Sequence, residues 1–190
     1  MKYIFTLLLL SYSFFVHAQK GTTTFSISYG EGKGQIKAML AKVEFAGFSS
    51  EGPTRSFDIG ASGMIGKHTS LDIGVSLLNH RYQYTSWDRP GRTPVNKSVN
   101  TFVFPIKLKV DILKYLFISG GFLLNSDMGG FSPDLGVSIG AGVQYYFNNK
   151  YGVFIFPQTN IHSITVGLKE SHTAFGIAYR IPYPNKLAKN

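Results

Sequence analysis

Four histidines outside the N-terminal segment are the residues best suited to acid–base chemistry: His68, His80, His162 and His172. A serine nucleophile needs its imidazole base on the same face of the chain. Ser163 follows His162, and Ser171 precedes His172, but neighbouring residues of a strand point to opposite faces. Neither pair can act as nucleophile and base unless the strand has already ended at that point. A serine on a strand across from His80 could form such a pair, but no motif supports one. We therefore expect no enzyme activity.

Two of these histidines, His162 and His172, lie near one predicted loop, where together they could ligate a metal. Two histidines without a third ligand are a weak metal site. The sequence also has no phosphate-cradling glycine-rich loop and no His-Glu-x-x-His pattern. We predict no catalytic residue, no metal and no cofactor, and leave a lipid-modifying enzyme as an alternative to be tested by lipid A deacylation or acyl transfer.

Five charged residues occupy the polar side of segments that otherwise alternate with apolar residues: Asp72, Lys107, Lys109, Asp111 and Arg180. If these segments are strands of a narrow barrel, all five side chains point into its interior. Buried charges need partners, so we predict an interior network of salt bridges and hydrogen bonds. The alternative is a path for protons or ions, which a narrow lumen disfavours.

The segment 84–98 contains the single tryptophan and several basic residues. Its candidate contact residues are Trp87, Arg89, Arg92 and Lys97. Arginine matches phosphate in bidentate geometry, so this extracellular loop could bind lipopolysaccharide phosphates or another ligand. A solvated loop capped by the tryptophan is the simpler alternative.

The elements that position these residues are segments of period two, which is the pattern of half-exposed β-strands. The clearest runs from Leu135 to Phe147, where apolar residues alternate with glycine, serine and other small or polar residues. Similar alternation predicts eight strands, at residues 22–30, 55–66, 69–83, 99–112, 115–125, 134–147, 151–162 and 172–181.

The predicted connections alternate between tight turns and longer loops. Tight turns are predicted at 66–68, 113–114 and 148–150, and longer loops at 31–54, 84–98, 126–133 and 163–171. Short turns at one end and long loops at the other, on an even number of strands, are typical of an outer-membrane β-barrel. Within the first loop, residues 36–48 could be irregular, partly helical or an extended hairpin, and we favour a loop with some helix.

The first eighteen residues have the pattern of a cleaved signal peptide: Lys2, an apolar stretch, and Val16-His17-Ala18 at the cleavage positions. The apolar stretch is too short for a membrane-spanning helix. We therefore predict a signal peptide at 1–18, a barrel at 19–181 and a short tail at 182–190. Cleavage removes one lysine and lowers the formal charge of +9 to +8.

Composition supports an exported barrel. The 190 residues include 21 glycines and no cysteine, and only 15% are charged. Without cysteine the chain has no disulfide, no cysteine-based metal site and no lipobox anchor. A basic exported chain does not meet cytoplasmic nucleic acid, so anionic lipid is the more plausible counterpart of its charge.

Several segments resemble the PorT-like outer-membrane β-barrel family, often labelled "porin family". They are Thr24–Gly30, Phe104–Lys109 followed by Tyr115-Leu116 and Gly120-Gly121, and Asp134–Val143. The resemblance implies an architecture similar to that of OmpX and the OmpA membrane domain, and no assigned activity. Its motifs encode strands rather than chemistry, and the chain continues past its last predicted strand instead of ending on an aromatic residue.

These observations predict an all-β protein: a closed, antiparallel, up-and-down transmembrane barrel in the outer membrane. We expect a monomer with a structural, adhesive or assembly-related role and no open pore. Its expected partners are outer-membrane lipid or lipopolysaccharide and, during insertion, the barrel-assembly machinery. A soluble lipocalin-like carrier is a further alternative, but a carrier needs an apolar lumen and this one is predicted to be polar.

Overall fold

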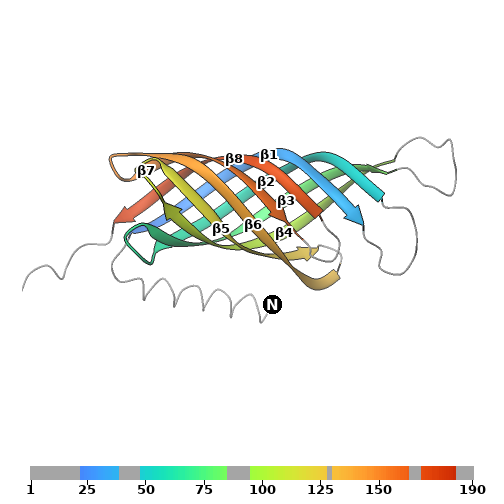
Figure 1. Ribbon diagram of the computed structural model, residues 1–190, viewed down its shortest axis with the longest axis horizontal. Helices are drawn as coiled ribbons and strands as arrows, with labels where there is room; N and C mark the ends of the chain where they lie inside the picture. Colours follow the sequence, from blue (N-terminus) through green and yellow to red (C-terminus); the bar gives the residue numbers. More distant parts are fainter. Residues whose placement is uncertain (1–21, 39–47, 85–94, 128–129, 163–167, 183–190) are drawn as a thin grey trace, which may run out of the picture.

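The computed structural model describes residues 22–38, 48–84, 95–127, 130–162 and 168–182. These segments form eight antiparallel strands that close into one barrel in sequence order (Figure 1). The strands are β1 (Thr22–Ala38), β2 (Phe48–Met64), β3 (Thr69–Tyr84), β4 (Val95–Asp111), β5 (Leu116–Asp127), β6 (Gly130–Phe147), β7 (Tyr151–Ile161) and β8 (Leu168–Pro182). The predicted eight-stranded, up-and-down closed barrel is confirmed.

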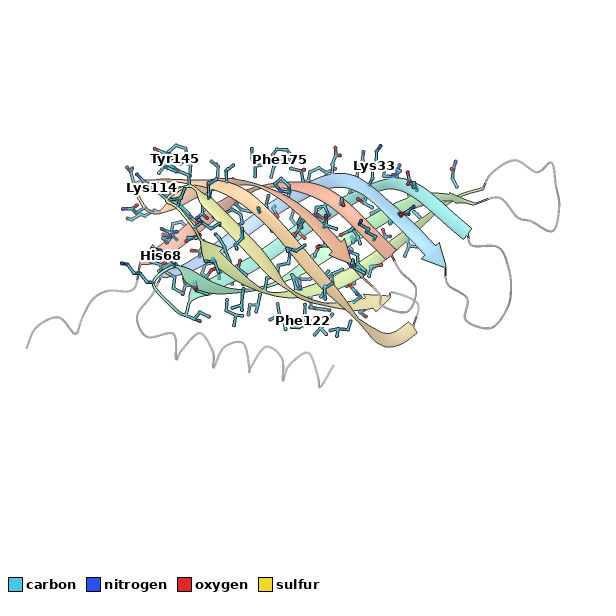
Figure 2. All side chains as sticks on the ribbon, in the orientation of Figure 1. Lys33, His68, Lys114, Phe122, Tyr145 and Phe175 are labelled. Atoms are coloured by element: carbon cyan, nitrogen blue, oxygen red, sulfur yellow. The ribbon has the colours of Figure 1, made fainter. Side chains whose placement is uncertain are left out.

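The outer wall of the barrel is apolar because alternate residues of every strand point outward. Aliphatic and aromatic side chains on this face are largely exposed, among them Phe57, Ile139 and Ile177 at 47%, 71% and 63%. Figure 2 shows such side chains, including Phe122 and Phe175, projecting away from the wall. A wall of this kind is stable only against lipid, since water would have to hydrate all of this surface.

The strands are staggered as they go round the barrel. From Thr24 the register passes through Ser62, Asp72, Lys107, Gly121, Ser138, Asn160 and Glu170 and returns to β1 at Gly34. A stagger of ten residues over eight strands tilts the strands to the barrel axis. Every residue on this path faces inward, and the lumen is just wide enough for side chains to fill it.

Three short turns join strands at one end of the barrel, as predicted. Backbone hydrogen bonds close them, from Ile65 N to Thr69 O at 2.9 Å, from Ile112 N to Leu116 O at 3.0 Å and from Lys150 N to Phe147 O at 3.0 Å. Asn148 and Asn149 have φ angles of 49° and 56°, which asparagine tolerates better than other non-glycine residues. Strand β1 begins and β8 ends at this same end (Figure 1).

The strands are longer than predicted at the opposite end. Residues 31–38 and 48–54 were expected in a loop, but they continue the β1–β2 hairpin, and β4, β6 and β8 also begin earlier than expected. On β1 and β8 the exposed side chains in this part are polar, namely Glu31, Lys33, Lys169 and Ser171. The period-two pattern therefore disappears while the backbone pairing goes on. Residues 39–47 lie outside the described part of the chain, as do the predicted signal peptide at 1–18 and residues 183–190 of the predicted tail.

Two apolar clusters occupy the lumen. Leu78, Val103 and Leu123 pack together on β3, β4 and β5. Phe117 and Phe156 form the second cluster with Ala174, their ring centroids 5.2 Å apart, and Phe154 packs against it. Polar lumen residues lie beside these clusters, since Lys109 Nζ is 4.4 Å from the centroid of the Phe117 ring and Lys107 Nζ is 5.5 Å from that of Phe156. No helix among the described residues is long and apolar enough to cross a membrane.

Candidate functional site in the lumen

The lumen contains a charged cluster toward the short-turn end, built from residues of β4 and β6. Lys109 donates a hydrogen bond from Nζ to Gln144 Oε1 at 2.6 Å, and Gln144 Nε2 donates to Asp111 Oδ1 at 2.8 Å. Lys109 Nζ is 3.9 Å from Asp111 Oδ1 and 4.4 Å from the centroid of the Phe117 ring. Gln144 therefore bridges two of the five charges predicted to share a network.

Lys107 extends this polar interior toward the middle of the barrel. Its Nζ donates to Gln158 Oε1 on β7 at 2.7 Å and lies 5.5 Å from the centroid of the Phe156 ring. Asp72 is directly opposite Lys107 in the β3–β4 register and accepts a hydrogen bond from Ser70 at 3.1 Å. The Lys107–Gln158 hydrogen bond spans the lumen from β4 to β7.

Arg180 is also inside the barrel, where its guanidinium group contacts an aromatic ring. Its guanidinium carbon lies 3.8 Å from the centroid of the Tyr146 ring, which is a cation–π contact. The structure therefore brings Lys109 and Asp111 together, sets Asp72 against Lys107, and places Arg180 on an aromatic neighbour.

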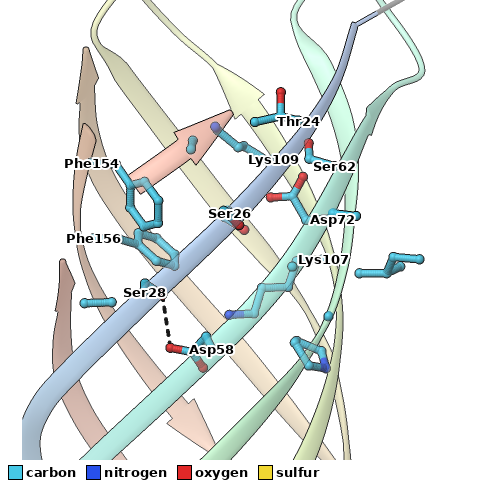
Figure 3. A pocket seen from close by; sticks show the side chains of 18 of the residues that line it. Thr24, Ser26, Ser28, Asp58, Ser62, Asp72, Lys107, Lys109, Phe154 and Phe156 are labelled. Atoms are coloured by element: carbon cyan, nitrogen blue, oxygen red, sulfur yellow. Dashed lines mark hydrogen bonds between the residues drawn. The ribbon is translucent and has the colours of Figure 1, made fainter. Parts of the chain in front are cut away.

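A cavity of about 140 Å³ lies between these groups. Figure 3 shows Lys107 and Lys109 from β4, Asp58 and Asp72 from β2 and β3, and Phe154 and Phe156 from β7 around it. Ser28 and Ser56 both donate to Asp58 Oδ2, at 3.2 and 3.1 Å. Two cations and two carboxylates balance in charge, so the cavity suits water better than an ion.

A second polar cluster fills the opposite end of the lumen and was not predicted. Glu170 is 1% exposed, and its Oε1 lies 2.7 Å from His162 Nε2 and 3.4 Å from His172 Nδ1. Asn160 Nδ2 donates a hydrogen bond to the same oxygen at 2.7 Å. One amide donor and two close imidazole nitrogens around a buried carboxylate favour its charged form.

The imidazoles of this cluster have defined partners on their other sides. His162 Nδ1 is 2.9 Å from Asn125 Oδ1, so both ring nitrogens of His162 face acceptors. Gln158 accepts from Lys107 through Oε1, which leaves its Nε2 to donate to His172 Nε2 at 2.5 Å. The middle of the lumen is thus joined to its long-strand end by one chain of contacts from Lys107 through Gln158 and His172 to Glu170.

Glycine on β1 makes room for these rings. A Cβ on Gly34 would lie 2.6 Å from His80 Cε1 and 2.8 Å from Thr54 Cγ2, and a Cβ on Gly30 would lie 2.7 Å from His172 Cδ2. His80 is itself 2% exposed. The inward face of β1 at this end is therefore occupied by side chains from other strands.

Glu170 was missed because β8 was predicted to begin at residue 172, whereas it begins at Leu168. The spacing of two residues between Glu170 and His172 was the available signal, since it puts both on one strand face. Among the described residues no group of three or more histidine, aspartate or glutamate side chains could hold a metal ion. His162 and His172 converge instead on a carboxylate.

The sequence also contains one Gly-x-Ser-x-Gly pattern, from Gly136 to Gly140. It lies within β6, where Ser138 is 5% exposed and faces the lumen. A nucleophile elbow needs a sharp strand-to-helix turn, which a position inside a strand does not supply.

Three of the four predicted extracellular contact residues lie outside the part of the chain that the structure describes, namely Trp87, Arg89 and Arg92. Lys97 belongs to β4, where the register places it opposite Tyr82.

Aromatic side chains gather near the short turns at one end of the barrel. Ring centroids are 4.8 Å apart for Tyr145 and Phe147, 5.3 Å for Tyr151 and Tyr179, and 5.9 Å for Tyr115 and Tyr145. All five are exposed on the outer wall. Such rings favour the headgroup layer of a membrane.

A closed barrel with an apolar outer wall, a polar filled lumen and an aromatic cluster at one rim defines a β-barrel membrane protein of the outer-membrane type. No family model matches the chain, and no curated protein matches it either.

Several solved structures are similar to the chain. One is the attachment invasion locus protein Ail of Yersinia pestis, in complex with the heparin analogue sucrose octasulfate; it is 14% identical, with a TM-score of 0.47, and the match covers 86% of this chain and all of Ail. Neisserial surface protein A is 12% identical, with a TM-score of 0.48 and coverage of 83% and 97%. The N-terminal barrel domain of Pseudomonas aeruginosa OprF is 14% identical, with a TM-score of 0.47 and coverage of 85% and 100%. Likeness at this level says nothing of function, and the membrane assignment rests on the barrel's own outer wall.

Proposed function

We propose that this protein is a closed outer-membrane barrel with a structural, adhesive or assembly-related role at the cell surface and no open pore. The observation that carries the proposal is the filled lumen. Lys107 reaches Gln158 across it, Phe117 and Phe156 pack within it, and Glu170 with its histidines fills the far end. A route for solutes would have to displace all three layers.

The length of the strands supports a surface role. A barrel strand needs about 10 residues to cross a membrane, whereas β1 and β2 have 17 residues each. On β1 the outward residues change from apolar at Tyr29 to charged at Glu31 and Lys33, and the paired hairpin continues to Ala38. The hairpin therefore extends past the apolar wall and presents polar side chains beyond the membrane.

Orientation and location are tested by cysteine labelling, because the natural chain has no cysteine. Glu51→Cys places a thiol on the exposed long hairpin, and Lys67→Cys places one on an exposed short turn. In intact cells a membrane-impermeant maleimide should label Glu51→Cys, and it should label Lys67→Cys only after the outer membrane is permeabilised. The reverse pattern, or recovery of the protein in the soluble periplasm, would contradict the proposal.

The closed lumen is tested by conductance. The purified full chain in planar bilayers should show no steady unitary current, while an open porin reconstituted in parallel shows one. Stable, reproducible channel openings by the wild-type chain would overturn the assignment of no open pore.

The sequence left two alternative functions open, a lipocalin-like carrier and a lipid-modifying enzyme. A lipocalin-like carrier does not fit, since the apolar side chains face outward and the lumen is charged. A lipid-modifying enzyme is the other alternative, and assay of the purified chain for lipid A deacylation or acyl transfer tests it. Membership of the PorT-like branch is part of the proposal and rests on the sequence resemblance.

The proposed partners follow from the same assignment. They are outer-membrane lipid or lipopolysaccharide and, during insertion, the barrel-assembly machinery. We propose a monomer, because a barrel closed on itself leaves no strand edge that needs a partner. We propose no nucleic-acid binding, because an exported chain does not meet cytoplasmic nucleic acid.

A further inference from the structure

A hollow of about 460 Å³ lies on the outer wall where β6, β7, β8 and β1 run side by side. Its floor consists of short outward side chains, namely Pro157, Thr159, Ser171 and Thr173. Thr159 Oγ1 and Ser171 Oγ share a hydrogen bond of 3.1 Å. The floor therefore presents hydroxyl groups on a wall that is otherwise apolar.

The hollow lies where the wall changes from apolar to polar. Along β8 the outward residues are apolar from Ile181 to Phe175 and then become Thr173, Ser171 and Lys169. Along β7 they are apolar up to Ile155, continue through Pro157 and Thr159 in the hollow, and end on Ile161, which is 40% exposed. In the membrane the change along β8 marks the boundary between acyl chains and headgroups.

The charge around the hollow is positive. Glu31 at its edge is held by Arg55 Nε at 3.3 Å and by the Tyr29 hydroxyl at 2.6 Å. Lys33 and Lys169 are exposed, and no carboxylate pairs with either among the described residues. Lys33 is directly opposite Ser171 in the β1–β8 register, and Lys169 lies two residues from Ser171 on the same face. Figure 2 shows Lys33 projecting from the outer wall.

An apolar wall adjoins the hollow on its other side. Ile139 on β6 is 71% exposed and lines it. Below it, toward the short-turn end, Ile155 and Phe175 continue the apolar surface. A molecule that fits has an anionic head beside the lysines and a hydrocarbon chain along these residues.

We infer that this hollow is a binding site for a phosphate-bearing lipid of the outer leaflet. The Lys33 and Lys169 ammonium groups contact the phosphate, one hydroxyl of the hydrogen-bonded Thr159–Ser171 pair donates to its oxygen, and an acyl chain runs down past Ile139 and Phe175. This inference rests on the membrane orientation in the proposed function and adds to it a defined lipid site.

The test compares lipid A bisphosphate with dephosphorylated lipid A, each titrated against the full chain in detergent micelles with bound lipid counted by native mass spectrometry. Lys33→Gln combined with Lys169→Gln should raise the bisphosphate concentration at half occupancy by about tenfold, since it removes two charge-assisted contacts. Lys67→Gln combined with Lys114→Gln makes the same charge change at the short turns and should leave that concentration unchanged. Ser171→Phe fills the hollow, keeps both lysines and should also weaken binding.

Equal affinity of the Lys33/Lys169 double variant and the wild type for the bisphosphate would overturn the site. So would a loss of affinity in the Lys67/Lys114 control variant as large as the loss in the Lys33/Lys169 variant. So would equal binding of the two lipids by the wild-type chain, which tests the idea without any substitution. Cysteine labelling separates this from failure of the proposed function: normal labelling with no phosphate preference removes only the lipid site, while inverted labelling removes the orientation on which both depend.

Discussion

His162 Nε2 lies 2.7 Å from Glu170 Oε1 inside the barrel, with the two side chains 5% and 1% exposed. His162 directly follows the last residue of β7, and Glu170 is the third residue of β8, so this contact joins the ends of two neighbouring strands. Asn125 of β5 supports the far side of the imidazole. A contact among three strands stabilises the barrel at the end where its strands extend beyond the membrane.

Replacing Glu170 with glutamine should therefore destabilise the folded barrel strongly. Breaking a buried pair by removing one charge typically costs about 3–5 kcal/mol, because the remaining partner stays desolvated. Urea unfolding followed by far-UV circular dichroism in a fixed detergent measures the change in the free energy of unfolding. Arg55→Ala, which breaks the exposed Arg55–Glu31 pair, is the control and should cost under about 1 kcal/mol. Equal losses of unfolding free energy in the two variants would show that the buried pair stabilises the barrel no more than the exposed pair does.

Lys109→Met should cost more stability than Arg180→Leu, although both residues were predicted to belong to one network. Lys109 loses a hydrogen bond to Gln144 and its proximity to Asp111, a loss of roughly 1–3 kcal/mol. Arg180 loses one ring contact with Tyr146, which is worth about 0.5–2 kcal/mol. The midpoint of heat-modified migration on gels ranks the two variants. A larger loss from Arg180→Leu would mean that its guanidinium has the more important partner.

Gly34→Ala should destabilise the barrel because the new methyl group would meet the His80 ring. Overpacking of this kind costs about 1–3 kcal/mol. Gly66→Ala is the matched control, since a Cβ there has its nearest neighbour at 3.7 Å. Combining Gly34→Ala with His80→Ala should recover part of the loss, and a double-mutant cycle of unfolding free energies measures that recovery. Purely additive losses would place the strain somewhere other than the ring.

Sequence reasoning found the barrel because lipid imposes a strong period-two pattern. In segments such as Leu135–Phe147 the alternation is regular because one face meets hydrocarbon and the other faces the lumen. The same dependence explains the missed strand ends: from Gly30 to Gln35 both faces of β1 are polar or glycine, so pattern alone could not show that pairing continues to Ala38. Strand existence was thus predictable, and strand length outside the membrane was not.

The lumen was predictable in outline only. Alternation placed Lys107, Lys109, Asp111, Asp72 and Arg180 inside, and the structure puts all five there. It could not show which of them meet, because partners such as Gln144 and Gln158 come from strands distant in sequence and depend on the stagger. Glu170 was hidden by the late predicted start of β8.

The ten-residue stagger of the register has a consequence for how such a chain can change. Strand number and stagger together determine the diameter of a closed sheet, and side chains do not enter that relation. Smaller residues in the interior would leave voids in a tube of unchanged bore. Widening the bore requires another hairpin or a different offset between strands, so a permeable descendant of this protein would arise by duplication or insertion of strands and not by point substitution.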